Sequence, residues 1–111
     1  VWLGGDAMIF IKKHETEFGA ILALCDEELI GKKFSEGERE LDLNSYSGFY
    51  TGEKIDEAAA AEIVSQTKIY SANVVGKRSV GIFLKQKLVK KENVKKISDV
   101  PFVQVYNVSE L

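Results

Sequence analysis

Cys25 is the only cysteine in the chain, and three acidic residues follow it directly in the stretch CDEELIGKKF, residues 25–34. A nucleophilic cysteine needs a thiol pKa lowered by nearby cations or a helix N-terminus, together with an adjacent base. The acids at 26–28 would raise that pKa instead, and the single histidine, His14, lies in a different segment. We therefore predict a buried structural cysteine at the end of a strand, and we assign no catalytic residue.

The tripeptide Gly31-Lys32-Lys33 in the same stretch could be taken for a phosphate-binding loop. Such a loop has a longer glycine-bearing turn between a strand and a helix, with Ser or Thr after the lysine. Phe34 follows the lysines here. A glycine turn with solvated lysines is therefore the better interpretation.

Acidic residues alternate along 36–42, where Glu36, Glu38, Glu40 and Asp42 could supply carboxylates for acid-base chemistry or for a hard metal ion. No catalytic partner residue accompanies them, and a solvated strand face produces the same alternation. One cysteine and one histidine do not make a set of soft ligands for zinc. We therefore predict neither a metal site nor a cofactor.

A basic stretch lies between residues 77 and 96, where Glu92 is the one acid. Helical spacing would place Asn73, Lys77, Gly81 and Lys85 on one stripe, with small residues that let a phosphate backbone approach. The alternative interpretation is that the lysines only keep the outer face of a helix in water. That interpretation accounts for a mixture of charges but not for a stretch that is almost entirely positive. We predict an RNA-binding surface made of eight residues: Lys77, Arg78, Lys85, Lys87, Lys90, Lys91, Lys95 and Lys96.

The two halves of the chain carry opposite charge. Residues 1–62 hold 14 acids and 6 bases, a net charge of −8, whereas residues 63–111 hold 3 acids and 9 bases, a net charge of +6. Such asymmetry indicates that two surfaces meet different partners. Structured RNA is expected at the basic half and a protein partner at the acidic half. A membrane surface is not expected, because the apolar face of the basic helix is needed for the core.

The strands expected to position these residues lie mostly in the first half. Residues 8–13 and 20–25 should form an antiparallel hairpin, followed by a helical turn for which Asp26 is the cap. The alternating segment 38–43 is predicted to be a strand, and so is the short aromatic pair Phe49–Tyr50.

Two helices and a last strand complete the expected fold. Strong helix formers after Asp56 predict a helix over 56–66, and apolar spacing predicts a second over 71–89, with Val80 and Phe83 on its buried face. The strand begins after Pro101. This order predicts an α+β fold with a small antiparallel or mixed sheet and two main helices packed on one face.

A chain of 111 residues fits one domain, and no run is apolar enough to cross a bilayer. The strand that starts at Met8 suggests that residues 1–7 are a start extension or added residues, and that 8–111 form the single domain. We expect a cytoplasmic protein.

The order of CDEELIGKKF, FYTGEKIDEAAA, ANVVGKRSV, NVKKISDVP and a terminal VQV strand resembles the archaeal family known as domain of unknown function 424. The resemblance runs from about residue 8 to 108. It implies a small archaeal cytoplasmic α+β protein and brings no established activity. Many members have His-Ala-Gln after Val-Pro, where this chain has Phe102, Val103 and Gln104, so a catalysis that used that histidine could not operate here.

Taken together, these patterns predict a small RNA-binding protein that is ribosome- or translation-associated and contacts phosphates through its basic helix and loop. Two alternatives stay open at the level of sequence. One is a protein-interaction module or a homodimer that pairs its acidic and basic faces without catalysis. The other is an uncharacterised enzyme that uses Cys25 or the acidic strand.

Overall fold

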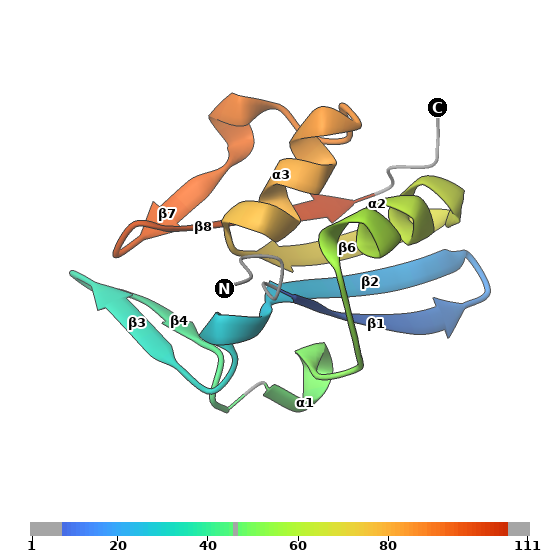
Figure 1. Cartoon of the computed structure of the whole chain (residues 1–111). Coiled ribbons are helices and arrows are strands. Elements are labelled where there is room, and N and C mark those ends of the chain that lie inside the picture. The colour runs from blue at the N-terminus through green and yellow to red at the C-terminus, as the bar shows by residue number, and fades with distance from the viewer. Residues whose placement is uncertain (1–7, 46, 107–111) are drawn as a thin grey trace, which may run out of the picture.

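The computed structural model describes residues 8–45 and 47–106, which fold into an α+β structure (Figure 1). The predicted fold class is therefore confirmed. The expectation for residues 1–7 falls outside the described part of the chain.

A six-stranded mixed sheet forms the centre of the described structure, with the strand order β5-β1-β2-β6-β8-β7. Strand β2 pairs with β1 on one side, antiparallel, and with β6 on the other, parallel; the remaining neighbours are antiparallel. The bounds are β1 (Ile9–Thr16), β2 (Gly19–Asp26), β5 (Glu53–Ile55), β6 (Ile69–Val75), β7 (Lys95–Ile97) and β8 (Val100–Tyr106). The predicted first hairpin and last strand are present.

A separate two-stranded sheet, β3 (Lys33–Glu36) and β4 (Arg39–Asp42), lies beside the β7–β8 turn. Ser98 in that turn anchors it, since its backbone N–H donates to the Glu36 carboxylate over 2.8 Å. The strand predicted at Phe49–Tyr50 is wrong: these residues end a short helix, α1 (Ser47–Tyr50). There Phe49 stacks on His14 of β1 with ring centroids 4.8 Å apart, a contact that a sequence pattern does not reveal.

Helix α2 (Glu57–Gln66) forms as predicted, and the Asp56 side chain caps it by accepting from the Ala59 N–H over 2.8 Å. The second predicted helix is only partly right. Its first part is strand β6, and helix α3 covers Lys77–Lys85. Strand β6 lies between β2 and β8, and five of its seven residues are buried, whereas Tyr70 is exposed and Asn73 is half-buried. No helix in residues 8–45 and 47–106 has the length and apolar character that a bilayer crossing requires.

The main hydrophobic core joins both long helices to the sheet. Alternate residues of β1, β2, β6 and β8 contribute to it, and Val64 of α2 and Phe83 of α3 are almost completely buried there. A smaller core around Cys25 and Leu43 lies beneath the β3–β4 hairpin and α1. Two short 3-10 turns complete the described structure: η2 (Glu27–Leu29) lies between β2 and β3, and η3 (Lys91–Asn93) lies between α3 and β7.

Candidate functional site

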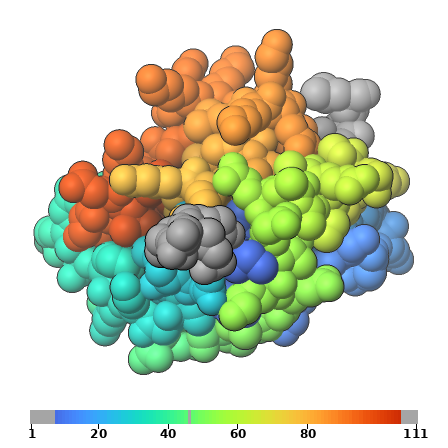
Figure 2. Space-filling model, viewed as in Figure 1, coloured from blue at the N-terminus to red at the C-terminus, as the bar shows by residue number. Residues whose placement is uncertain are grey.

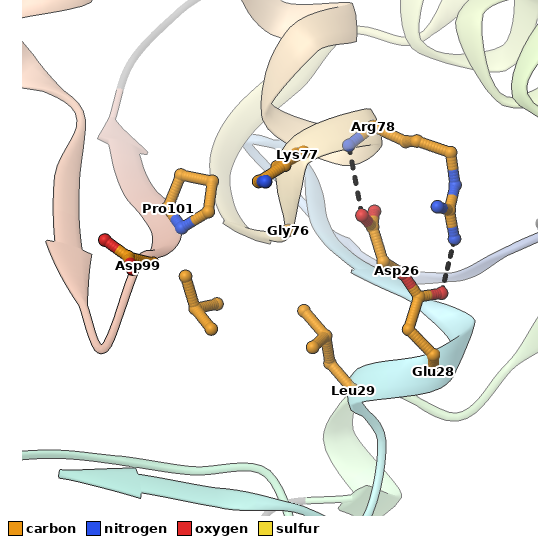
Figure 3. Close-up of a pocket in the computed structure, with 9 residues that line it drawn as sticks. Asp26, Glu28, Leu29, Gly76, Lys77, Arg78, Asp99 and Pro101 are labelled. Carbon is orange, nitrogen blue, oxygen red and sulfur yellow. Dashed lines mark hydrogen bonds and ion pairs between the residues drawn. The ribbon is translucent and has the colours of Figure 1, made fainter.

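The start of α3 is held by a carboxylate that comes from the end of β2 (Figure 3). The Asp26 side chain accepts hydrogen bonds from the backbone N–H of Arg78 over 3.0 Å and of Ser79 over 2.9 Å, and from the Ser79 hydroxyl over 2.7 Å. Asp26 was expected to cap its own turn, η2, but it makes no side-chain bond there. The expected cap is therefore wrong in its target: Asp26 caps α3.

The N-terminus of a helix attracts an anion, and here the Asp26 carboxylate already takes that place. Gly76, which precedes α3, has a φ of 107°, and a Cβ at that position would overlap the Asp26 carboxyl group. The close approach of these two residues joins β2 to α3. The helix N-terminus is thus part of the fold and is not open to an external phosphate.

Arg78 is engaged in the same junction. Its guanidinium donates to the Met8 carbonyl over 3.1 Å and forms an ion pair with Glu28, while Nε is buried with no hydrogen-bond partner among the described residues. The hydrogen bond that Arg78 donates to the Glu28 carboxylate raises the pKa of Arg78. Partial burial works against ionisation of Glu28, yet the hydrogen bond and charge of Arg78 lower its pKa below the ordinary value. Arg78 is therefore held by the protein itself, unlike the lysines that follow.

A pocket of about 190 Å³ lies next to this junction. Asp26, Glu28 and Asp99 face it together with Lys77 and Arg78, as the close-up in Figure 3 shows. Three carboxylates beside two cations leave no excess of positive charge. This pocket is poorly suited to a phosphate.

On the other side of Lys77 lies a second cavity, an open groove of about 340 Å³ between α3 and the chain that runs from η3 into β7. Three exposed lysines and five buried or half-buried apolar residues line it. The lysines are Lys77, Lys91 and Lys96, and the apolar residues are Val80, Gly81, Leu84, Val94 and Pro101. We call this cavity the Gly81 groove.

The structure thus brings two predicted basic segments to opposite walls of one groove. Lys77 comes from α3, whereas Lys91 and Lys96 come from the segment after it. The remaining lysines of the segment, Lys85, Lys87, Lys90 and Lys95, are exposed, and Lys85 lines a different cavity, which it shares with Glu57 of α2. Figure 2 shows residues 77–96 (orange) in the upper part of the molecule. None of these seven lysines forms a salt bridge with a residue in the described ranges.

Asn73 does not belong to this surface. It lies in β6, and its side-chain oxygen accepts from the Gln104 amide over 2.9 Å. The predicted helical stripe is therefore not one surface, since Lys77 and Gly81 line the Gly81 groove whereas Lys85 lines a separate cavity next to α2.

Three of the four predicted acids, Glu36, Glu40 and Asp42, are each bound by a different partner, and Glu36 accepts from Ser98 as described above. Glu40 pairs with Lys33 at 3.3 Å, and Asp42 accepts from the backbone N–H groups of Asn44 and Ser45 over 3.0 and 2.9 Å. Within residues 8–45 and 47–106, no group of three His, Cys, Asp or Glu side chains is placed as a metal ion would require. The carboxylates serve the hairpin and the turn after it.

Cys25 is fully buried near the end of β2, as predicted. Burial raises its thiol pKa to about 12, with smaller contributions from the charges of Asp26 and Glu28. The same burial raises the pKa of the neighbouring Tyr50 to about 12. Both groups are protonated at neutral pH, so neither is prepared for nucleophilic or base chemistry.

The apolar wall of the groove is the part of the site that sequence reasoning missed. The sequence predicts Val80 on the buried face of a helix, and nothing in the sequence pattern associates it with Val94 or Pro101. The available signal was Gly81, a glycine among helix-forming residues, which often marks a special packing or functional position.

Comparison with known proteins gives a family and a fold. A family model described as "Protein of unknown function (DUF424)" matches residues 14–108. The crystal structure of an uncharacterized conserved protein from Methanopyrus kandleri is similar at 25% identity, with a TM-score of 0.77 over 91% of this chain and 92% of that chain. No curated protein matches.

Proposed function

The chain belongs to the DUF424 family of proteins of unknown function, and we propose that this member binds structured RNA through phosphate contacts from α3 and the segment after it. A place on the ribosome or with the translation machinery, in the cytoplasm, is part of the proposal. The predicted arrangement in which both main helices cover one face of the sheet is also part of the proposal. The hydrophobic core that the two helices share with the sheet supports it.

One observation carries the proposal. Seven exposed lysines lie within residues 77–96, three of them on the walls of the Gly81 groove, and none forms a salt bridge with a described carboxylate. Like charges held together repel each other, and a bound polyanion relieves that repulsion. The lysines in turn release the counterions that are condensed on the phosphates, which favours binding. RNA presents such a row of charges at its backbone.

The eight predicted residues are not equivalent within this proposal. Lys85, Lys87, Lys90 and Lys95 have free ammonium groups on the outer surface, and Lys77, Lys91 and Lys96 line the groove. Arg78 contributes least, because its guanidinium is held by Glu28 and by the Met8 carbonyl. The contacts are to phosphates, so the proposal includes no base-specific reading.

The test is a titration of structured ribosomal RNA fragments at several salt concentrations. The logarithm of the affinity should fall linearly with the logarithm of the salt concentration, and the triple replacement of Lys85, Lys90 and Lys95 by Gln should reduce the slope by about one unit per lost contact. The melting temperature should barely change, because exposed charges add little stability.

The matched control replaces the acids Glu38 and Glu40 by Gln, which removes charge from the opposite half. RNA affinity should then stay the same or rise, because a repulsive charge has been lost. Absence of binding at low salt would reject the proposal. Equal losses from the acidic and basic variants, with a mass that rises with concentration, would indicate instead a homodimer that pairs the two faces.

A further inference from the structure

Gly81 is the middle residue of α3, and the fold does not require a glycine there. Glycine in a helix interior is less stable than alanine because its backbone loses more conformational freedom on folding. At other glycines of this chain the reason is visible: Gly76 has a positive φ and touches Asp26. A Cβ built on Gly81 meets nothing within 4 Å, and its φ is not in the left-handed region. The open space next to it is the Gly81 groove.

Phosphate binding does not account for this space. Phosphates need the ammonium groups of the lysines, whereas Val80, Leu84, Val94 and Pro101 offer only apolar surface. A phosphate that lay deep in the groove would lose water without gaining a donor from these walls. The groove is therefore an additional feature of the basic surface.

A nucleobase also fits poorly. Proteins that hold unpaired bases stack them on aromatic or arginine side chains and satisfy their polar edges by hydrogen bonds. Among the described residues, the lining contains no aromatic side chain, amide or hydroxyl, and its polar side chains are lysines. An aliphatic or aromatic side chain of a protein has no polar edge to satisfy, so it matches the walls better.

The three lysines indicate what accompanies that side chain. Lys77 stands on one wall and Lys91 and Lys96 on the other, so a ligand lying in the groove has cations on both sides. Carboxylates that flank the apolar anchor would pair with them. We propose that the Gly81 groove binds an acidic segment of a partner protein, with one aliphatic or aromatic side chain packed against Gly81.

This proposal is independent of RNA binding, although the two ligands share Lys77, Lys91 and Lys96. A bound acidic segment would neutralise these three lysines and exclude phosphates from them. RNA bound to the outer lysines would still leave the apolar walls free.

The experiment is a selection of random decapeptides on the immobilised full chain, followed by affinity titrations of the enriched sequences. The selected peptides should carry one Leu, Ile, Met or Phe with Asp or Glu on both sides. Replacing that anchor by Ser should weaken binding about tenfold or more, because the burial of one large apolar side chain is lost. Enrichment of peptides without this pattern, or of none, would overturn the proposal.

Gly81→Leu is the matched variant of the protein, since its side chain fills the groove and the backbone there accepts any residue. It should abolish binding of the selected peptides while its melting temperature does not fall. If Gly81→Leu binds the peptides as tightly as the original chain, the groove is not their site. A double variant, with Lys91→Glu and Lys96→Glu, leaves α3 unchanged and should also abolish peptide binding. Loss of RNA binding in Gly81→Leu, with peptide binding intact, would assign the groove to a nucleotide.

Discussion

Cys25 shows how burial and neighbouring charge fix the chemistry of one residue. With a thiol pKa of about 12, only on the order of 1 in 10⁴ thiols is ionised at pH 8. We expect the folded protein to react with iodoacetamide very slowly at pH 8, and the unfolded protein to react at the rate of an ordinary thiol. The measurement is mass spectrometry of the alkylated chain with and without denaturant.

Cys25→Ala provides the control for that experiment. It should destabilise the fold by about 1 to 2 kcal/mol, as the loss of a small buried side chain does, and leave RNA affinity unchanged. Rapid alkylation of the folded chain would show that the thiol is accessible and would revive the enzymatic alternative.

Asp26 and Asp56 each cap a helix, but under different conditions. Asp26 is 2% exposed and accepts three hydrogen bonds, whereas Asp56 is exposed and accepts one from Ala59. We expect Asp56→Ala to cost about 1 kcal/mol and Asp26→Ala to cost about 3 kcal/mol or more, since several buried donors lose their partner at once. Urea unfolding of both variants measures the difference. Equal costs would mean that water replaces the buried carboxylate.

At the scale of elements, two glycines, one just before α3 and one in its middle, have opposite requirements. Gly81→Ala should stabilise the protein by about 1 kcal/mol, because the new methyl group enters open space and the helix gains propensity. Gly76→Ala should destabilise it by about 2 kcal/mol or more, because φ is positive there and the Cβ collides with Asp26. Thermal unfolding distinguishes the two, and a stabilising Gly76→Ala would contradict the described junction.

The elements that the sequence predicted well are those whose signals are local. The β1–β2 hairpin is predicted by a turn between two apolar runs, and α2 is predicted by its helix-forming residues and by the capping residue Asp56. The start of α3 was misplaced because its cap, Asp26, is 52 residues upstream of Arg78 in the chain. No nearby side chain marks the boundary, and residues 71–75 have apolar spacing that also suits a helix. Tertiary pairing with β2 and β8 decides in favour of a strand.

The candidate site also has one part that the sequence predicts and another part that it does not. The basic segment was visible in the sequence because charge is a local property of composition. Its groove was not visible, since Lys77 and Lys96 become opposite walls only when β7 pairs with β8 and brings Pro101 under α3. The engagement of Arg78 by Glu28, 50 positions away, was equally hidden.

The whole molecule should not open uniformly. Strand β2 is paired on both sides and buried in both cores, whereas the β3–β4 hairpin is a separate sheet whose residues are mostly exposed. Amide hydrogen exchange should therefore be slowest in β2 and β6 and much faster in β3 and β4, which can open without disturbing the main sheet. Exchange measured by NMR gives the comparison residue by residue. Equal protection of the hairpin and β2 would mean that the two sheets open together.

The contact between Gly76 and Asp26 also restricts how this sequence can change over evolutionary time. A side chain at position 76 collides with Asp26 and strains the backbone, so that position cannot vary while the aspartate is in place. The dependence runs in one direction, because position 26 can lose its carboxylate and leave Gly76 unstrained. Relatives that keep an acid at position 26 should therefore also keep glycine at position 76, although the reverse need not hold. In any aligned set of such chains, this one-sided association would identify the members that share the same join between β2 and α3.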